Sequence, residues 1–144
     1  MRVGRLIPSA VPGLALLLMS PPGHACTCEV FGDGSPRSAM RHAKAVFVGE
    51  VLEVRAATNA EREEYSSAYI VRLRVERYRK GIKSGEINVE TDLTGCGPYF
   101  RVGEEFLVYG VGKRLSTACS RTRKLEHAKE DLKALGPGKL FKPK

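Results

Sequence analysis

The sequence predicts an all-β domain with flanking helices, in which five short strands close into a small antiparallel barrel. Apolar and polar residues alternate with a period of two between Tyr69 and Glu76, which is typical of a strand with one buried face. Other short runs are rich in valine, isoleucine and aromatic residues, and no βαβ rhythm separates them. The cysteine count of 4 allows two disulfides to reinforce this core.

The first 25 residues have the layout of a secretory signal peptide, with Arg2 and Arg5 before an apolar run and small residues before a cleavage point after Ala25. The apolar run is too short to span a bilayer, so we expect no transmembrane anchor. Cleavage would make Cys26 the first mature residue of a secreted or periplasmic protein. The alternative is a lipoprotein acylated at Cys26, although Gly23 stands where such proteins usually have an apolar residue.

The remaining chain has the size of one domain, which we place at residues 26–137, followed by a loose basic tail at 138–144. The whole chain has a formal net charge of +8, and the leader contributes two arginines and no acidic residue to it. A basic balance attracts anionic partners but identifies none of them.

The first predicted elements are a helix and a strand. Ser35-Pro36 predicts a helix start, with Ser as the N-cap and Pro in the first position, continuing over residues 37–43. Residues 45–54 form the first strand, and Gly49-Glu50 within it predicts a bulge or a sharp bend. The polar residues 56–66 predict a hairpin loop.

The predicted elements that follow are strands at residues 69–78, 86–91, 105–111 and 115–120 and a helix at residues 123–135. Gly136-Pro137 predicts the end of that helix. Five strands with helices only at the edges predict a Greek-key barrel of the oligonucleotide/oligosaccharide-binding (OB) type, with the terminal helix packed on it. A β-sandwich is the alternative, although it usually needs more strands.

The four cysteines, at 26, 28, 96 and 119, allow three pairings. A bond between Cys26 and Cys28 would close a very small strained ring, so we discard that pairing. Both remaining pairings connect the N-terminal segment to the second half of the chain. Either one would immobilise a terminus, which is normally frayed.

Several ordered motifs resemble the N-terminal, netrin-like domain of the tissue inhibitors of metalloproteinases. The motifs, in chain order, are Cys26-Thr27-Cys28 after the leader, Ala45-Val46-Phe47-Val48-Gly49, Tyr78-Arg79-Lys80-Gly81, Cys96-Gly97, Gly103-Glu104-Glu105-Phe106-Leu107-Val108-Tyr109 and Thr117-Ala118-Cys119. They cover nearly the whole chain after the leader. The resemblance implies an OB barrel with bridges Cys26–Cys96 and Cys28–Cys119.

The resemblance also implies a function, inhibition of a zinc metalloendopeptidase. In that family the α-amine and carbonyl oxygen of the first cysteine chelate the protease's zinc, and the second residue enters the adjacent specificity pocket. These roles would fall to Cys26 and Thr27, with Cys28 and the neighbouring Thr94 and Gly95 beside them. An unperturbed α-amine has a pKa near 8, so a neutral fraction able to bind metal exists at neutral pH. Netrin-like domains also occur as plain binding modules.

No other motif predicts chemistry of the chain's own. His42 and His127 have no metal-site spacing, Ser116 and Ser120 have no nucleophile signature, and we interpret Asp92 and Asp131 as ordinary acids. We therefore expect no enzymatic activity, no cofactor and no resident metal. The partner's zinc at Cys26 is the single metal contact expected.

A basic strand face supplies the alternative function, a non-inhibitory extracellular or envelope binding module. Its residues are Arg72, Arg74, Arg77, Arg79, Lys80 and Lys83. Such a face can bind a sulfated glycan or nucleic acid, with Tyr65, Tyr69, Tyr78 and Tyr99 available for stacking. Glu76 interrupts the set and an exported protein rarely meets nucleic acid, so we favour a solvated, partly paired face and expect no nucleic-acid partner.

Overall fold

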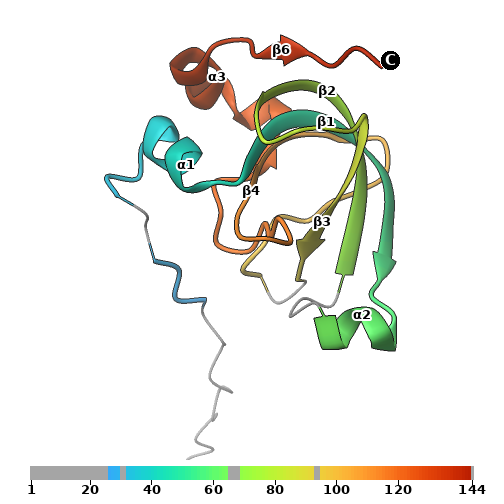
Figure 1. Cartoon of the computed structure of the whole chain (residues 1–144). Coiled ribbons are helices and arrows are strands. Elements are labelled where there is room, and N and C mark those ends of the chain that lie inside the picture. Colours follow the sequence, from blue (N-terminus) through green and yellow to red (C-terminus); the bar gives the residue numbers. More distant parts are fainter. Residues whose placement is uncertain (1–25, 30–31, 65–68, 93–94, 144) are drawn as a thin grey trace, which may run out of the picture.

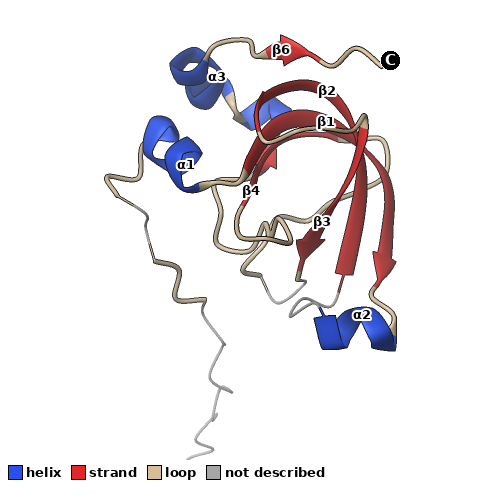
Figure 2. Cartoon of the chain, viewed as in Figure 1, coloured by secondary structure: helices blue, strands red, loops and turns tan. Residues whose placement is uncertain are grey.

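The computed structural model describes residues 26–29, 32–64, 69–92 and 95–143. Its elements, in chain order, are α1 (Pro36–His42), β1 (Ala45–Ala56), α2 (Asn59–Glu64), β2 (Tyr69–Lys80), β3 (Glu86–Thr91), β4 (Glu105–Gly110), β5 (Arg123–Lys124), the 3-10 turn η1 (Leu125–His127), α3 (Lys129–Leu135) and β6 (Lys139–Leu140). The strands form one 6-stranded antiparallel sheet in the order β3-β2-β1-β4-β5, with β6 pairing with β2 (Figures 1 and 2).

The sheet is built around β1, which pairs with β2 on one side and β4 on the other. The pairing of β1 with β2 shifts register at three places, one of them between Val48 and Gly49, so the bulge predicted there is confirmed. A Cβ at Gly49 would lie 2.8 Å from the carbonyl oxygen of Arg74, which only glycine avoids. Such irregularities bend strands, and Figure 1 shows β1 and β2 curving strongly.

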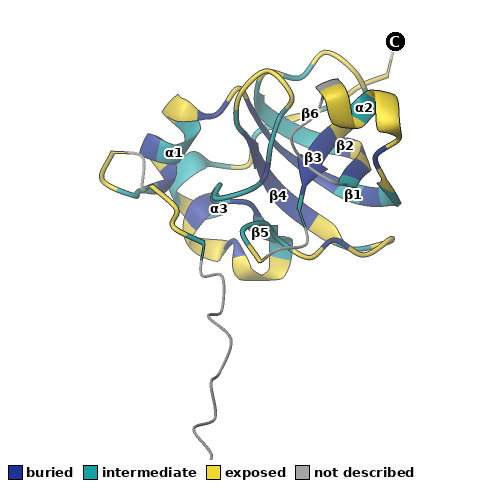
Figure 3. Ribbon diagram, turned by 90° about the horizontal axis from the view of Figure 1, so that it is seen from below, coloured by how far each residue is buried: buried dark blue, intermediate teal, exposed yellow. Residues whose placement is uncertain are grey.

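The sheet buries apolar side chains on both of its faces. The inner core contains Phe47, Val51, Leu73 and other side chains of β1 to β4. The outer core contains Val46, Val48, Leu107, Tyr109 and Ala128, and side chains of α1, η1 and α3 pack against it. Successive side chains of a strand point to opposite faces of the sheet, so they enter the inner and the outer core in turn. The buried stretches of β1 and β4 in Figure 3 agree with this.

The predicted fifth strand at residues 115–120 is wrong. Leu115 and Cys119 have φ values of 55° and 53°, which interrupt an extended backbone, and Ser116 makes only isolated bridges to Glu90 and Val111. The chain instead pairs with β4 through the short β5, inside the stretch predicted as helix. The predicted helix at 123–135 is consequently shorter, and α3 begins at Lys129.

Two segments predicted as loop or tail are ordered. The hairpin connection contains α2, where Thr58 Oγ1 accepts the Glu61 N–H at 3.3 Å and Glu61 Oε2 accepts the Thr58 N–H at 2.9 Å. This reciprocal pair is a capping box, a Thr-x-x-Glu signal that the sequence interpretation missed. The tail includes β6, because the N–H of Phe141 also bonds to the carbonyl of Glu76 at 2.9 Å.

Candidate functional site

Two disulfides hold the N-terminal segment against the sheet. Cys26 bonds to Cys96 and Cys28 bonds to Cys119, with Cα–Cα distances of 5.4 and 5.2 Å. These are the pairings that the family resemblance implied. A bridge on each side of Thr27 leaves that residue few backbone conformations.

The two anchor points are themselves connected. The N–H of Cys119 donates to the carbonyl oxygen of Cys96 at 2.6 Å. Two residues earlier, the N–H and the Oγ1 of fully buried Thr117 both donate to the carbonyl oxygen of Glu90 at 2.9 Å. A Cβ at Gly97 would lie 2.7 Å from Thr91 Oγ1, so the backbone beside Cys96 fits closely against β3. We call residues 95–97 and 116–119 the anchor platform.

The predicted contact residues lie at the surface of this platform. Thr27, Cys28 and Gly95 are exposed, and Cys26 is half-buried. Thr94 lies outside the described residues. The bridges therefore bring Cys26, Thr27, Cys28 and Gly95 from two distant stretches of the chain to one place.

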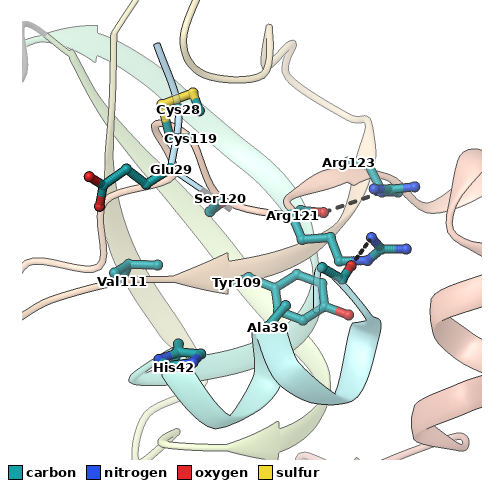
Figure 4. Close-up of a pocket in the computed structure, with 11 residues that line it drawn as sticks. Cys28, Glu29, Ala39, His42, Tyr109, Val111, Cys119, Ser120, Arg121 and Arg123 are labelled. Carbon is teal, nitrogen blue, oxygen red and sulfur yellow. Dashed lines mark hydrogen bonds between the residues drawn. A yellow bond between two sulfur atoms is a disulfide. The ribbon is translucent and has the colours of Figure 1, made fainter. Parts of the chain in front are cut away.

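A cavity of about 240 Å³ lies beside the second bridge (Figure 4). The cavity is lined by Tyr109 of β4, by Ala39 and His42 of α1, and by the bridged Cys28 and Cys119. Its other lining residues are Glu29, Gly34, Val111, Ser120, Arg121 and Arg123. In Figure 4 the Tyr109 ring lies beside Ala39, and Arg121 and Arg123 lie at one side of the cavity.

A buried network of charged and polar side chains lies next to this cavity. Asp131 of α3 is fully buried and accepts hydrogen bonds from Arg121 Nε at 2.6 Å and Tyr109 Oη at 2.7 Å. Arg121 Nη1 donates to the carbonyl oxygen of Gly34 at 2.9 Å, and Arg123 Nη1 lies 3.7 Å from Asp131 Oδ2. The carboxylate of Asp131 thus connects three parts of the fold, which are α3, β4 and the loop that precedes α1.

The network shifts the pKa values of Tyr109 and Arg121. Burial, and then the hydrogen bond to Asp131, raise the pKa of the Tyr109 phenol. The hydrogen bond to Asp131 raises the pKa of the Arg121 guanidinium. The interpretation of Asp131 as an ordinary acid is therefore wrong. The sequence gives little indication that Asp131 is buried and hydrogen-bonded, because its partners Arg121 and Tyr109 lie 10 and 22 positions away.

Two of the six residues of the basic strand face, which was the alternative binding surface, are paired with acidic residues. Arg72 lies 3.3 Å from Glu53 and 3.0 Å from Glu86, and Arg74 pairs with Glu50. Other members of the predicted set point to different partners. Arg79 Nε donates to the carbonyl oxygen of Gly136 at 3.0 Å, and Lys80 Nζ donates to the α1 carbonyls of Met40 and Arg41 at 3.1 and 3.0 Å.

Metal ligands of the chain's own do not gather in the described residues, where no group of three or more His, Cys, Asp or Glu side chains could hold an ion. His127 lies 3.3 Å from the carboxylate of Glu126 at the surface, and His42 borders the cavity. In the same part of the chain, no helix has the length and apolar character needed to cross a membrane.

The chain matches no protein-family model and no curated protein sequence.

Proposed function

We propose that the chain is an inhibitor of a zinc metalloendopeptidase, acting through its mature N-terminus at Cys26 and resembling the tissue inhibitors of metalloproteinases. The observation that carries the proposal is the anchor platform, which holds an exposed Thr27 between two disulfides. A terminus fixed in this way loses little conformational freedom when it enters a cleft, and this lowers the cost of binding.

The chemistry of the proposal belongs to main-chain atoms. The Cys26 thiol is consumed by its bridge, so the atoms offered to the protease's zinc are the α-amine nitrogen and the carbonyl oxygen of Cys26. They displace the water that the protease needs for hydrolysis. Thr27 then enters the adjoining pocket, and the loop at Thr94 and Gly95 contacts the rim. The finer fold assignment, an OB Greek-key barrel, is part of the same proposal.

The experiment compares three forms of the protein against a panel of zinc metalloendopeptidases. The first begins at an unmodified Cys26, the second carries one extra alanine before Cys26, and the third carries one extra alanine after Lys144. The second form should lose on the order of 100-fold in inhibition, because the extension removes the α-amine ligand. The third form and all three unfolding midpoints should be unchanged.

Equal inhibition by the first two forms would overturn the zinc-chelating mechanism, and inhibition of no member of the panel would overturn the proposed function. The alternative binding module on Arg72, Arg74 and Arg79 has less support, because Arg72 and Arg74 are paired with glutamates and Arg79 bonds to the Gly136 carbonyl. We therefore expect their substitution by alanine to lower retention on a polyanion column only as much as the loss of three positive charges elsewhere on the surface would.

A further inference from the structure

A second surface, made by α3, β6 and the turn between them, carries cationic and apolar groups together. We define the α3–β6 surface by the exposed residues Lys129, Lys133, Pro137, Leu140 and Lys142, beside which Glu130 of α3 is also exposed. Figure 1 shows α3 and β6 on the upper side of the molecule, whereas residues 26–29 lie low in the view, below α1. This surface is therefore separate from the proposed inhibitory terminus.

The three lysines of the α3–β6 surface form no ion pair with a carboxylate within the part of the chain that the structure describes. The exposed acid of α3, Glu130, lies 3.1 Å from Arg121. On the strand face, Arg72 and Arg74 have carboxylate partners, whereas Arg77 and Lys83 form no ion pair among the described residues.

The apolar part of the surface is held in place by the sheet. Leu140 is 57 % exposed, yet its backbone pairs with Arg77 of β2. The next residue, Phe141, donates its N–H to the Glu76 carbonyl oxygen. Its ring packs edge-on against Tyr78, with ring centroids 6.3 Å apart. Gly138 lies so close to β2 that a Cβ there would be 2.9 Å from the Tyr78 carbonyl oxygen. Leu140 is therefore presented by a fixed strand and is not the end of a loose tail.

A groove adjoins this leucine. It has a volume of about 490 Å³ and lies between α3 with η1 and the outer face of the sheet. Its lining is mainly apolar, with Val48, Leu125, Leu132 and Pro137, and the charged side chains of Glu76, Arg77 and Arg79 border it. Because Leu140 is the register partner of Arg77, its side chain lies on the same face as the groove.

We propose that the α3–β6 surface docks on an anionic phospholipid bilayer. Lysines near such a surface are attracted by the negative headgroups, and an exposed leucine among them can enter the interface between headgroups and acyl chains. A soluble polyanion would complement the lysines equally well but would leave the apolar residues without a partner. The bilayer supplies both kinds of group in one plane.

The test uses the unlipidated mature protein, verified by intact mass, and co-sedimentation with vesicles. Neutral vesicles contain phosphatidylcholine alone, and anionic vesicles contain about a third of phosphatidylglycerol. We expect binding to the anionic vesicles only, weakening as salt rises from about 0.05 M to about 0.3 M because the Debye length shortens.

Substitutions then locate the surface. The pair Lys133→Gln with Lys142→Gln should weaken binding about 25-fold, since each basic residue at an anionic surface contributes about fivefold. Leu140→Ser should weaken it several-fold and leave the salt dependence unchanged. The matched control, Arg101→Gln with Lys113→Gln, removes the same charge from exposed positions outside this surface and should bind like the wild type.

Three results would overturn the proposal. They are equal binding to neutral and anionic vesicles, equal weakening by the lysine pair and its control, and retention on a sulfated polysaccharide without binding to either vesicle. Each variant's unfolding midpoint should match that of the wild type, because all the substituted side chains are exposed.

Discussion

The N-terminal segment and the C-terminal segment are both fixed to the same sheet, but by different chemistry. Residues 26–28 are joined to the anchor platform by two covalent bonds and remain at the surface. The C-terminal segment is held by burial: Asp131 and Ala128 are fully buried, and Leu132 packs against the outer core. The helix α3 has only 7 residues and no side-chain N-cap, so it depends on these tertiary contacts.

The difference indicates what each segment can offer to a partner. A covalently anchored segment needs no apolar burial of its own, so its main-chain atoms can stay exposed for binding. A segment anchored by burial must turn one face inward, and only its outer face is available. The proposed inhibitory contact accordingly uses the backbone of Cys26, whereas the α3–β6 surface uses side chains.

The largest expected effect comes from removing one of the two disulfides that hold the N-terminal segment. In the double variant Cys28→Ser with Cys119→Ser, the free energy of unfolding should fall by about 4 kcal/mol, because the bridge closes a loop with a sequence separation of 91 residues. Guanidinium unfolding measures this change. The vesicle binding of the folded variant should persist, since the α3–β6 surface does not contact the bridge. A loss below about 1 kcal/mol would show that the entropic restraint is small.

The next effect comes from the C-terminal anchor. Asp131→Ala should lower the free energy of unfolding by about 3 kcal/mol, because it leaves Arg121 and the Tyr109 hydroxyl without their buried carboxylate. The matched control is Glu130→Ala, which removes the exposed carboxylate paired with the same arginine and should cost less than about 1 kcal/mol. Equal losses for the two variants would contradict a special role for the buried carboxylate.

The same comparison explains how far the sequence predicts the structure. Local signals succeeded where one element determines its own geometry, as in the Ser35-Pro36 helix start and the alternation of β2. They failed at residues 115–120, which were predicted as a strand, because two residues there have positive φ values and the segment forms part of the platform bonded to Cys28. No local pattern in the sequence indicates that these residues must adopt the backbone conformation that places Cys119 beside Cys28.

The long-range contacts show the same limit. Asp131 gives no sign in the sequence of its contacts with Arg121 and Tyr109, because helical, turn and strand residues meet only in the folded chain. The tail residues Lys139 and Leu140 have weak strand signals and form β6 because β2 offers an edge beside them. The disulfide pairing came from the family resemblance, since the cysteine positions alone left two alternatives.

The smallest effect concerns Glu76, where the C-terminal segment meets the sheet. Burial, and then the nearby carboxylates of Glu105 and Glu50, raise the pKa of the Glu76 carboxyl above 4.5, while Arg74 acts in the opposite direction. The folded state therefore holds this proton more tightly than the unfolded state, so the ionised carboxylate destabilises the fold at neutral pH. Glu76→Gln should raise the unfolding midpoint at pH 7.

The advantage of Glu76→Gln over the wild type should shrink as the pH falls and vanish below 4.5, where the carboxyl is protonated in both states. Midpoints measured across this range test the sign directly. The control Glu61→Gln should behave oppositely, because Arg55 and then the Thr58 N–H lower the pKa of Glu61 to about 2, so its ionised form stabilises the fold. If the difference in unfolding midpoint between Glu76→Gln and the wild type does not depend on pH, its cause is packing in the groove beside β6. The contact between the C-terminal segment and the sheet would then depend on how well the side chains fit and not on the charge of Glu76.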